Sequence, residues 1–221
     1  MNDRQTVNKM RVSFDLDEVL FVSPETHKTE PPPPPLLRRC FKERLRLGTP
    51  ELIRTLQERG CEVWVYTSSF RSERYIRWLF LLYGVRFNGI VNGDRHLREV
   101  QRNNRTILPQ KLPSRYRISL HIDDENIVCA LGRQYGYRTY QLTDQDDDWK
   151  EKIIARAAEI RKLDYPEDEI SRQPEETGKQ PEKTGKQPEE TGKQPEETGK
   201  QPEETGKQPE ETGKQPEVSD E

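Results

Sequence analysis

Four aspartates are the residues of this sequence best suited to chemistry, and they occur as two close pairs. Asp15 and Asp17 follow the apolar run RVSF, and Asp123 and Asp124 follow the run RISLHI. If the pairs meet, the carboxylates repel one another and their pKa values rise unless a cation joins them. Oxygen ligands with no thiolate and no evident histidine favour a hard cation. The pattern therefore predicts a site for Mg²⁺.

Hydroxyl and amine groups at other positions complete this set. Thr67 and Ser68 follow the β-rich run CEVWVY, and Lys111 lies twelve residues before Asp123. A carboxylate nucleophile, a second carboxylate for proton transfer, a metal and cationic or hydroxyl donors are what phosphoryl transfer through an aspartyl-phosphate requires. Lys111 is the least specific member of the set, because a solvent-exposed surface lysine is the simpler alternative.

The fold must bring these residues together, and the hydrophobic pattern indicates how. Strands are expected at 11–15, 61–66, 86–91, 117–122 and 138–142, and helices at 49–59, 71–83, 125–135 and 149–163. Thr49 is expected to be the N-cap of the first helix, with Pro50 in its first turn and Gly60 at its end. The alternation predicts a three-layer, Rossmann-like α/β domain, in which helices cover both faces of a parallel sheet. Ligands bind at the carboxyl ends of such strands, which is where the polar residues occur.

Several polar residues have simpler structural explanations. Each aspartate pair alone could be a strand-end turn or a helix N-cap. Ser69 is expected to cap a helix, His121 to be a packed or hydrogen-bonded core residue, and Cys129 to lie in the core. The acidic run at 144–148 precedes a helix, where carboxylates favour the positive end of the helix dipole. We interpret this run as capping, with a second metal site as the alternative.

Four elements, in this order, resemble the haloacid dehalogenase (HAD) superfamily: FDLDEVL, VWVYTSS, Lys111 and HIDDEN. The resemblance covers residues 10–145 and implies a HAD-like phosphatase. By this resemblance, Asp15 attacks the phosphorus atom, and Asp17 protonates the leaving group and then activates the hydrolytic water. An aspartate at position 17 favours a phosphatase over the dehalogenase and phosphonatase branches.

The resemblance also assigns the remaining site residues. Thr67 and the backbone N–H of Ser68 would hold phosphoryl oxygens, and Lys111 would neutralise the nucleophile and the phosphate. The implied ligands of Mg²⁺ are Asp15, the backbone carbonyl of Asp17, and either Asp123 or Asp124. Which of these last two aspartates binds the ion directly stays open.

The gaps between the motifs bear on the substrate. Residues 18–48 form a small insert that is too short for a helical cap domain, and the segment between Ser69 and Lys111 has no room for a large cap. An open site favours a macromolecular or extended phosphorylated substrate, such as a phosphoprotein or a nucleic-acid end, or else closure by another subunit. FDLDEVL and YTSS are also similar to the capless phosphatases that act on the RNA polymerase tail.

The insert itself has two unusual segments. Residues 31–35 are five prolines, a stiff polyproline segment that is either a flap edge or a ligand for a proline-binding module. The basic residues between Arg38 and Arg46 are interpreted as a solvated helix face, with steering of a polyanion as the alternative.

The chain divides near residue 172 into a body and a repetitive tail. From Gln173 to Lys214 the heptapeptide QPEETGK occurs six times, with one variant at Lys183. The tail, 173–221, has a net charge of −7 and the body, 1–172, a net charge of +4. A repeat of polar residues, proline and glycine cannot fill a coiled-coil seam or offset the cost of ordering the chain. The tail is predicted to be disordered, as a spacer or passenger.

Composition limits the class of protein. No apolar run is long enough for a transmembrane helix or a signal peptide. Three widely spaced cysteines argue against a disulfide framework and a zinc site, and for a reducing compartment, so a cytoplasmic protein is expected. Nucleic acid is a possible partner that the charge does not indicate. The prediction is a phosphatase. The alternatives are a nucleotide or nucleic-acid end phosphatase and a catalytically silent binding or scaffold protein, and the oligomeric state stays open.

Overall fold

The computed structural model describes residues 9–102, 104, 106–144 and 146–165. The predicted disordered tail, 173–221, lies outside these residues. None of the helices in the described part of the chain has the length and apolar character needed to cross a lipid bilayer.

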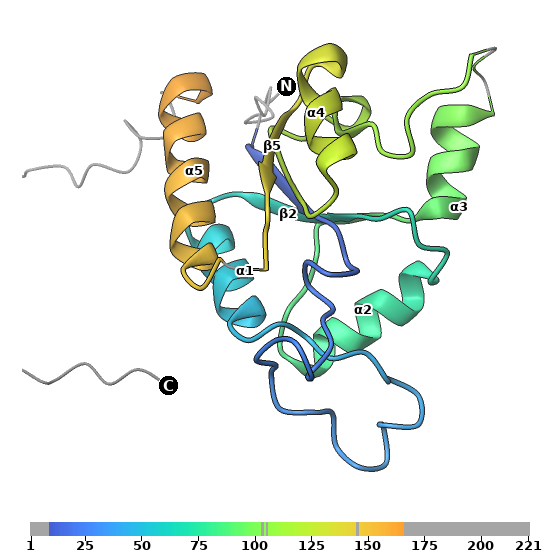
Figure 1. The fold of residues 1–221 in the computed structure, drawn as a ribbon, viewed down its shortest axis with the longest axis vertical. Helices are drawn as coiled ribbons and strands as arrows, with labels where there is room; N and C mark the ends of the chain where they lie inside the picture. Colours follow the sequence, from blue (N-terminus) through green and yellow to red (C-terminus); the bar gives the residue numbers. More distant parts are fainter. Residues whose placement is uncertain (1–8, 103, 105, 145, 166–221) are drawn as a thin grey trace, which may run out of the picture. The chain divides into compact units, whose positions relative to one another are not determined.

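A five-stranded parallel sheet forms the centre of the domain, with the strand order β3-β2-β1-β4-β5 (Figure 1). The strands are β1 (Arg11–Phe14), β2 (Glu62–Tyr66), β3 (Gly89–Val91), β4 (Leu120–Asp123) and β5 (Arg138–Gln141). Val12 of β1 lies opposite Val63 of β2 on one side and Leu120 of β4 on the other. The predicted parallel α/β fold is therefore confirmed.

Helices cover both faces of this sheet. They are α1 (Thr49–Glu58), α2 (Glu73–Leu82), α3 (Gly93–His96), α4 (Asn126–Tyr135) and α5 (Trp149–Asp164), with a π-helical turn at Leu97–Gln101 and a 3-10 turn at Pro113–Tyr116. Buried residues of α1, α2 and α5 share one core cluster with Val12 and Phe14. Tyr66, Val91 and Tyr116 pack in a second cluster. In Figure 1, β5 lies between α5 and α4.

The order of the strands places a switch point at β1. From β1 the chain passes to β2 and β3 on one side, and then returns to β4 and β5 on the other. Connections of opposite direction leave a crevice at the carboxyl ends of the strands where they diverge. The residues that follow β1, β2 and β4 are therefore brought to one edge of the sheet.

Some helix ends differ from the sequence-based expectations. Gly48, with a φ of 89°, is the N-cap of α1, and Thr49 is the first helical residue, so the expected Thr49 cap is wrong. A left-handed backbone at this point favours glycine over threonine. Asp148 precedes α5 but makes no capping hydrogen bond from its side chain. Instead, Asp146 and Asp148 form ion pairs with Lys152, at 2.5 and 2.8 Å.

The insert 18–48 contains no helix, so the expected helix face at its basic stretch is wrong. Arg46 is buried, and its guanidinium donates to the backbone oxygens of Val19 at 2.9 Å and Glu18 at 2.7 Å. Arg44 donates to the backbone oxygen of Glu30 at 2.8 Å. These arginines satisfy backbone carbonyls that a helix would have satisfied internally, and they hold the irregular insert against the domain.

Candidate active site

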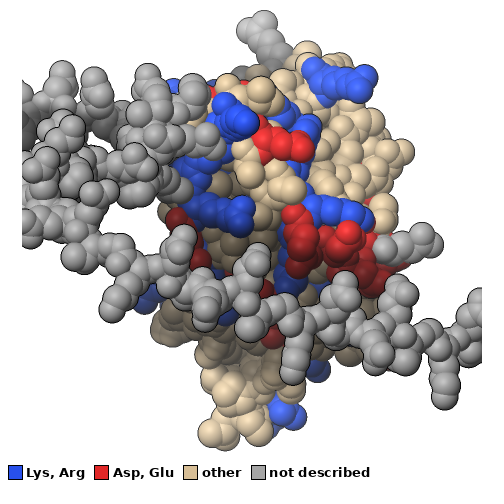
Figure 2. Space-filling model, turned by 90° about the vertical axis from the view of Figure 1, so that its left-hand side faces the viewer, with Lys and Arg blue, Asp and Glu red and all other residues tan. Residues whose placement is uncertain are grey.

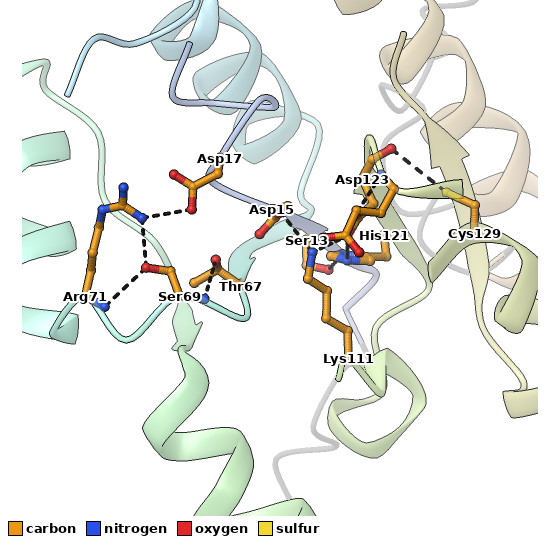
Figure 3. Close-up of polar contacts among 11 residues, drawn as sticks. Ser13, Asp15, Asp17, Thr67, Ser69, Arg71, Lys111, His121, Asp123 and Cys129 are labelled. Carbon is orange, nitrogen blue, oxygen red and sulfur yellow. Dashed lines mark hydrogen bonds and ion pairs between the residues drawn. The ribbon is translucent and has the colours of Figure 1, made fainter. Parts of the chain in front are cut away.

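The residues singled out from the sequence lie at the carboxyl edge of the sheet (Figure 3). Asp15 follows β1, Thr67 follows β2, and Asp123 is the last residue of β4. Asp124 comes next in the chain, and Lys111 is on the long connection from β3 to β4. Three strand ends and one connection thus supply the site.

Lys111 joins two buried carboxylates at the centre of this edge. Its Nζ lies 2.9 Å from Asp15 Oδ2 and 2.6 Å from Asp123 Oδ2, and its side chain has an exposed fraction of 0%. Burial is the largest influence on the pKa of Lys111 and lowers it, yet the charges of the two aspartates raise that pKa above its ordinary value. The ammonium is therefore the stable form, and the surface-lysine alternative is wrong.

Asp123 uses both of its carboxylate oxygens within the protein. Oδ2 accepts hydrogen bonds from Lys111 and from His121 Nε2, the latter at 2.8 Å, and Oδ1 accepts the backbone N–H of Glu125 at 3.0 Å. Burial raises the pKa of Asp123, but His121 and Lys111 outweigh burial and lower it overall. Asp123 is thus an ionised carboxylate that holds Lys111.

His121 extends this buried network to β1. It is fully buried, as the sequence predicted, and its Nδ1 lies 2.8 Å from the hydroxyl of Ser13. Ser13 and His121 are opposite each other in the β1–β4 register, and two residues further along the chain Asp15 follows β1 and Asp123 ends β4. Residues two apart in a strand face the same side of the sheet. The spacing of Ser13 from Asp15, and of His121 from Asp123, was therefore a signal in the sequence that Ser13 and His121 lie beneath the two aspartates.

The carboxylate cluster fits a hard cation. Oxygens of Asp15, Asp123 and Asp124 lie within 4.8 Å of one another. Asp15 Oδ1 is buried and has no hydrogen-bond partner in the described part of the chain. Burial raises the pKa of Asp15, and burial, followed by the charges of Asp123 and Asp15, raises the pKa of Asp124 to about 6. Buried carboxylate oxygens this close together fit a divalent cation, which would favour their ionised forms.

Asp17 does not join the other three carboxylates. Its side chain is half exposed, and Oδ2 lies 2.8 Å from Arg71 Nη1, so Asp17 is turned toward Arg71 (Figure 3). The expected meeting of four carboxylates is therefore a meeting of three. Nothing in the sequence distinguishes Arg71 from the many other arginines, so this partner was missed.

The loop after β2 supplies hydroxyl and amide groups. Thr67 is buried, its N–H donates to the Val91 oxygen at 2.9 Å, and its Oγ1 accepts the Ser69 N–H at 3.2 Å. The expected helix cap at Ser69 is wrong, because Ser72 caps α2 and the Ser69 hydroxyl accepts from Arg71. Ser68 lies between these two hydroxyl residues, in the same turn.

Cys129 on α4 is half buried, which corrects its expected place in the core. Its sulfur lies 3.9 Å from the backbone oxygen of Asp123, and burial raises the pKa of the thiol to about 11. A protonated thiol is a poor nucleophile, so this cysteine adds no reactive group to the site.

Comparisons with known proteins give matches among solved structures. No family model and no curated protein matches the sequence. A HAD-superfamily hydrolase of subfamily IA from Geobacter sulfurreducens shares 16% identity at a TM-score of 0.40, over 60% of this chain and 89% of that chain. The HAD domain of the effector protein Lem4 from Legionella pneumophila shares 12% identity at a TM-score of 0.42, over 66% and 93% of the two chains.

A third match is a predicted HAD-like family hydrolase from Porphyromonas gingivalis, with 14% identity, a TM-score of 0.39, and coverage of 67% of this chain and 97% of that chain. At these identities the likeness concerns the course of the chain alone, and the chemistry of the site depends on its own geometry. These three solved structures are described as HAD proteins, and the motifs of this chain resemble the same superfamily.

Proposed function

We propose that this protein is a Mg²⁺-dependent phosphomonoester hydrolase that acts through an aspartyl-phosphate on Asp15. One observation carries the proposal. Asp15 is a buried carboxylate with Oδ2 paired to Lys111 and Oδ1 without a partner in the described part of the chain. An oxygen that is buried, unpaired and next to a fixed cation is suited to attack an electrophilic phosphorus atom.

The residues that would hold Mg²⁺ are Asp15, the backbone carbonyl of Asp17, and Asp124. We favour Asp124 over Asp123 because both oxygens of Asp123 are already engaged by Lys111, His121 and the Glu125 N–H. A bound Mg²⁺ supplies positive charge that makes a phosphoryl group easier to attack.

The side chains then divide the reaction into two steps. An oxygen of Asp15 forms a bond to phosphorus as the ester P–O bond breaks, and Asp17 gives its proton to the leaving oxygen. Water next attacks the phosphorus, Asp17 takes the proton of that water, and Asp15 leaves as a carboxylate. Lys111, the hydroxyl of Thr67 and the N–H of Ser68 bind the phosphoryl oxygens through both steps.

The substrate proposed for this site is a phosphate group on an extended or macromolecular partner. The insert 18–48 forms no helical cap over the strand ends, and 52% of the Asp17 side chain is exposed. Nucleotides and nucleic-acid ends are a second candidate. Figure 2 shows both basic and acidic side chains on the side where α1 and α5 lie, so that face carries no uniformly basic surface.

The experiment is release of p-nitrophenol from p-nitrophenyl phosphate with and without Mg²⁺, for wild type and Asp15→Asn. Turnover is expected to need Mg²⁺ and to disappear in Asp15→Asn, because an amide is not a nucleophile here. Asp164→Asn is the matched control, since Asp164 forms a partly exposed pair with Arg138. Turnover that survives Asp15→Asn contradicts the proposed nucleophile.

A catalytically silent binding protein is distinguished by a second measurement. Mg²⁺ with beryllium fluoride, which imitates a phosphoryl group on an aspartate, is expected to raise the melting temperature of wild type and leave that of Asp15→Asn unchanged. No stabilisation together with no turnover favours the silent alternative.

A further inference from the structure

A second ion-pair network lies beside the buried cluster and contains Asp17. Arg71 Nη1 is 2.8 Å from Asp17 Oδ2 and 2.8 Å from Ser69 Oγ, and Arg71 Nε is 2.9 Å from Glu43 Oε1. Arg71 therefore connects three segments: the residues after β1, the insert, and the loop after β2.

Arg71 is held in this position through both its guanidinium and its backbone. It lies over the ring of Phe21, with 5.5 Å between the guanidinium carbon and the ring centroid. Asn92 donates to the backbone oxygen of Arg71 at 3.0 Å. The hydroxyl of Tyr75 donates to Glu43, so Glu43 is itself fixed. An arginine with this many contacts has little freedom to turn, and it orients the carboxylate that it binds.

The contact with Arg71 suits one of the two tasks of Asp17. A base that takes a proton from water must be held at a fixed place within hydrogen-bond reach of that water, and the guanidinium fixes the carboxylate of Asp17. The ion pair uses Oδ2, and the side chain is 52% exposed, so water reaches the carboxylate. The side-chain exposure of Arg71 is 30%, and that of Glu43 is 20%. The Arg71–Glu43 pair is thus less screened by solvent than the Arg71–Asp17 pair.

We propose that Arg71 is a positioning residue that orients Asp17 for activation of water, and that Glu43 of the insert holds Arg71 in place. This inference rests on the proposed function and adds a role for the insert. In the step concerned, water forms a bond to phosphorus, the bond from phosphorus to Asp15 breaks, and the proton of the water passes to Asp17. The proposed role of Arg71 is to act through Asp17, with which it pairs, and not on the phosphate or the water directly.

The test is steady-state and rapid-mixing kinetics of Arg71→Met with p-nitrophenyl phosphate and Mg²⁺. p-Nitrophenolate leaves without needing a proton, so kcat/KM reports phosphoryl transfer to Asp15 and is expected to stay within about twofold of wild type. The kcat value, which reports hydrolysis of the aspartyl-phosphate, is expected to fall about tenfold. KM is expected to fall by about the same factor as kcat. The first turnover is expected to release a burst of p-nitrophenol equal in amount to the active sites.

Matched variants separate positioning from damage to the fold. Glu43→Gln is expected to show the same split with a smaller loss of kcat, about threefold, because Arg71 keeps Asp17 but loses its anchor. Arg71→Lys is expected to recover part of kcat, since one ammonium cannot hold both carboxylates as the guanidinium does. Adding Arg71→Met to Asp17→Asn is expected to cause no further loss of kcat. Arg156→Met, which removes a surface pair with Glu159, is the control.

The outcomes distinguish this inference from the proposed function. Equal losses of kcat and kcat/KM in Arg71→Met, or unchanged kinetics, overturn the role of Arg71 while turnover that needs Asp15 stands. Additive losses in the double variant overturn it as well, since Arg71 then acts apart from Asp17. Turnover that survives Asp15→Asn, or no turnover in wild type, overturns both.

Discussion

Lys111 is the residue on which the charge balance of the buried site depends. It pairs with Asp15 and Asp123, and neither Lys111 nor Asp123 has any exposed side-chain surface. Lys111→Met leaves two buried carboxylates without their shared cation, and a loss of about 3–5 kcal/mol in the free energy of unfolding is expected. Urea denaturation measures it.

The matched control for this variant is Lys150→Met, which removes a lysine that pairs with the exposed carboxylate of Glu51. The loss expected for this control is much smaller, because solvent screens this surface pair. If the two variants lose similar stability, the buried pairs of Lys111 contribute no more than a surface pair, and the account of the site is wrong.

His96 gives a second prediction at this scale, one for pH. The hydroxyl oxygen of Tyr66 accepts the Leu112 N–H at 2.8 Å and lies 2.7 Å from His96 Nδ1. The hydroxyl therefore donates its own proton to Nδ1, which can accept it only in a neutral imidazole. Burial lowers the pKa of His96. Below the ordinary pKa of about 6.5 the unfolded chain then binds more protons than the native state, so stability is lost as pH falls.

The pH dependence is measured by urea denaturation between about pH 7.5 and pH 5, for wild type and His96→Phe. The wild-type free energy of unfolding is expected to fall more steeply below about pH 6.5 than that of the variant, and the difference between the curves isolates His96. Parallel curves contradict a buried neutral histidine at this position.

The candidate site could be predicted where residue type and strand-end position agreed. Asp15, Thr67 and Asp123 follow apolar runs directly, so a parallel sheet necessarily gathers them at one edge. The orientation of a side chain carries no such signal. That Arg71 binds Asp17 depends on where the insert places Glu43, which only the folded chain determines.

At the scale of elements, the contact between β2 and β3 is unusually specific. Gly89 of β3 lies opposite Trp64 of β2, and a Cβ atom on Gly89 would lie 2.3 Å from the Trp64 ring. The ring cannot easily move, because the Arg11 guanidinium lies 4.9 Å from its centroid. Gly89→Ala is expected to cost about 1–3 kcal/mol by overpacking.

A double-mutant cycle checks that the ring causes this cost. In a Trp64→Leu background the space above Gly89 is freed, and Gly89→Ala is expected to cost much less. Thermal or urea unfolding of the four proteins gives the coupling between the two positions. An equal cost in both backgrounds means that the loss comes from the backbone of β3 and not from Trp64.

The elements that could be predicted are those with a long periodic pattern. Helices α1, α2, α4 and α5 were found within a few residues of their bounds, because each repeats apolar residues at helical spacing. The start of β4 was expected three residues too early, since Arg117 takes a φ of 53° at the end of a 3-10 turn. The turns at 93–101 and 113–116 were missed because they are short and depend on tertiary contacts.

At the scale of the whole molecule, the body and the tail differ in the sign of their net charge. The full chain has a formal net charge of −3, while residues 1–172 alone have a net charge of +4. The net charge of a chain governs its long-range attraction to polyanions, whatever its fold. The acidic repeats are therefore proposed to weaken contact between the body and nucleic acid, which bears on the second candidate substrate.

Removal of residues 173–221 tests this proposal. The chain 1–172 is expected to elute from a heparin column at higher salt than the full chain, and to bind single-stranded DNA with a steeper dependence on salt, because counterions are released when a basic surface meets phosphates. Turnover of p-nitrophenyl phosphate, a small monoester, is expected to stay the same, because none of the proposed catalytic residues lies in the tail. A chain in which seven glutamates of the repeats are replaced by glutamine keeps the length and brings the net charge of the tail from −7 to 0, and is expected to behave as 1–172 does. If it instead elutes with the full chain, the repeats act through their length, and net charge does not govern the partners of this protein.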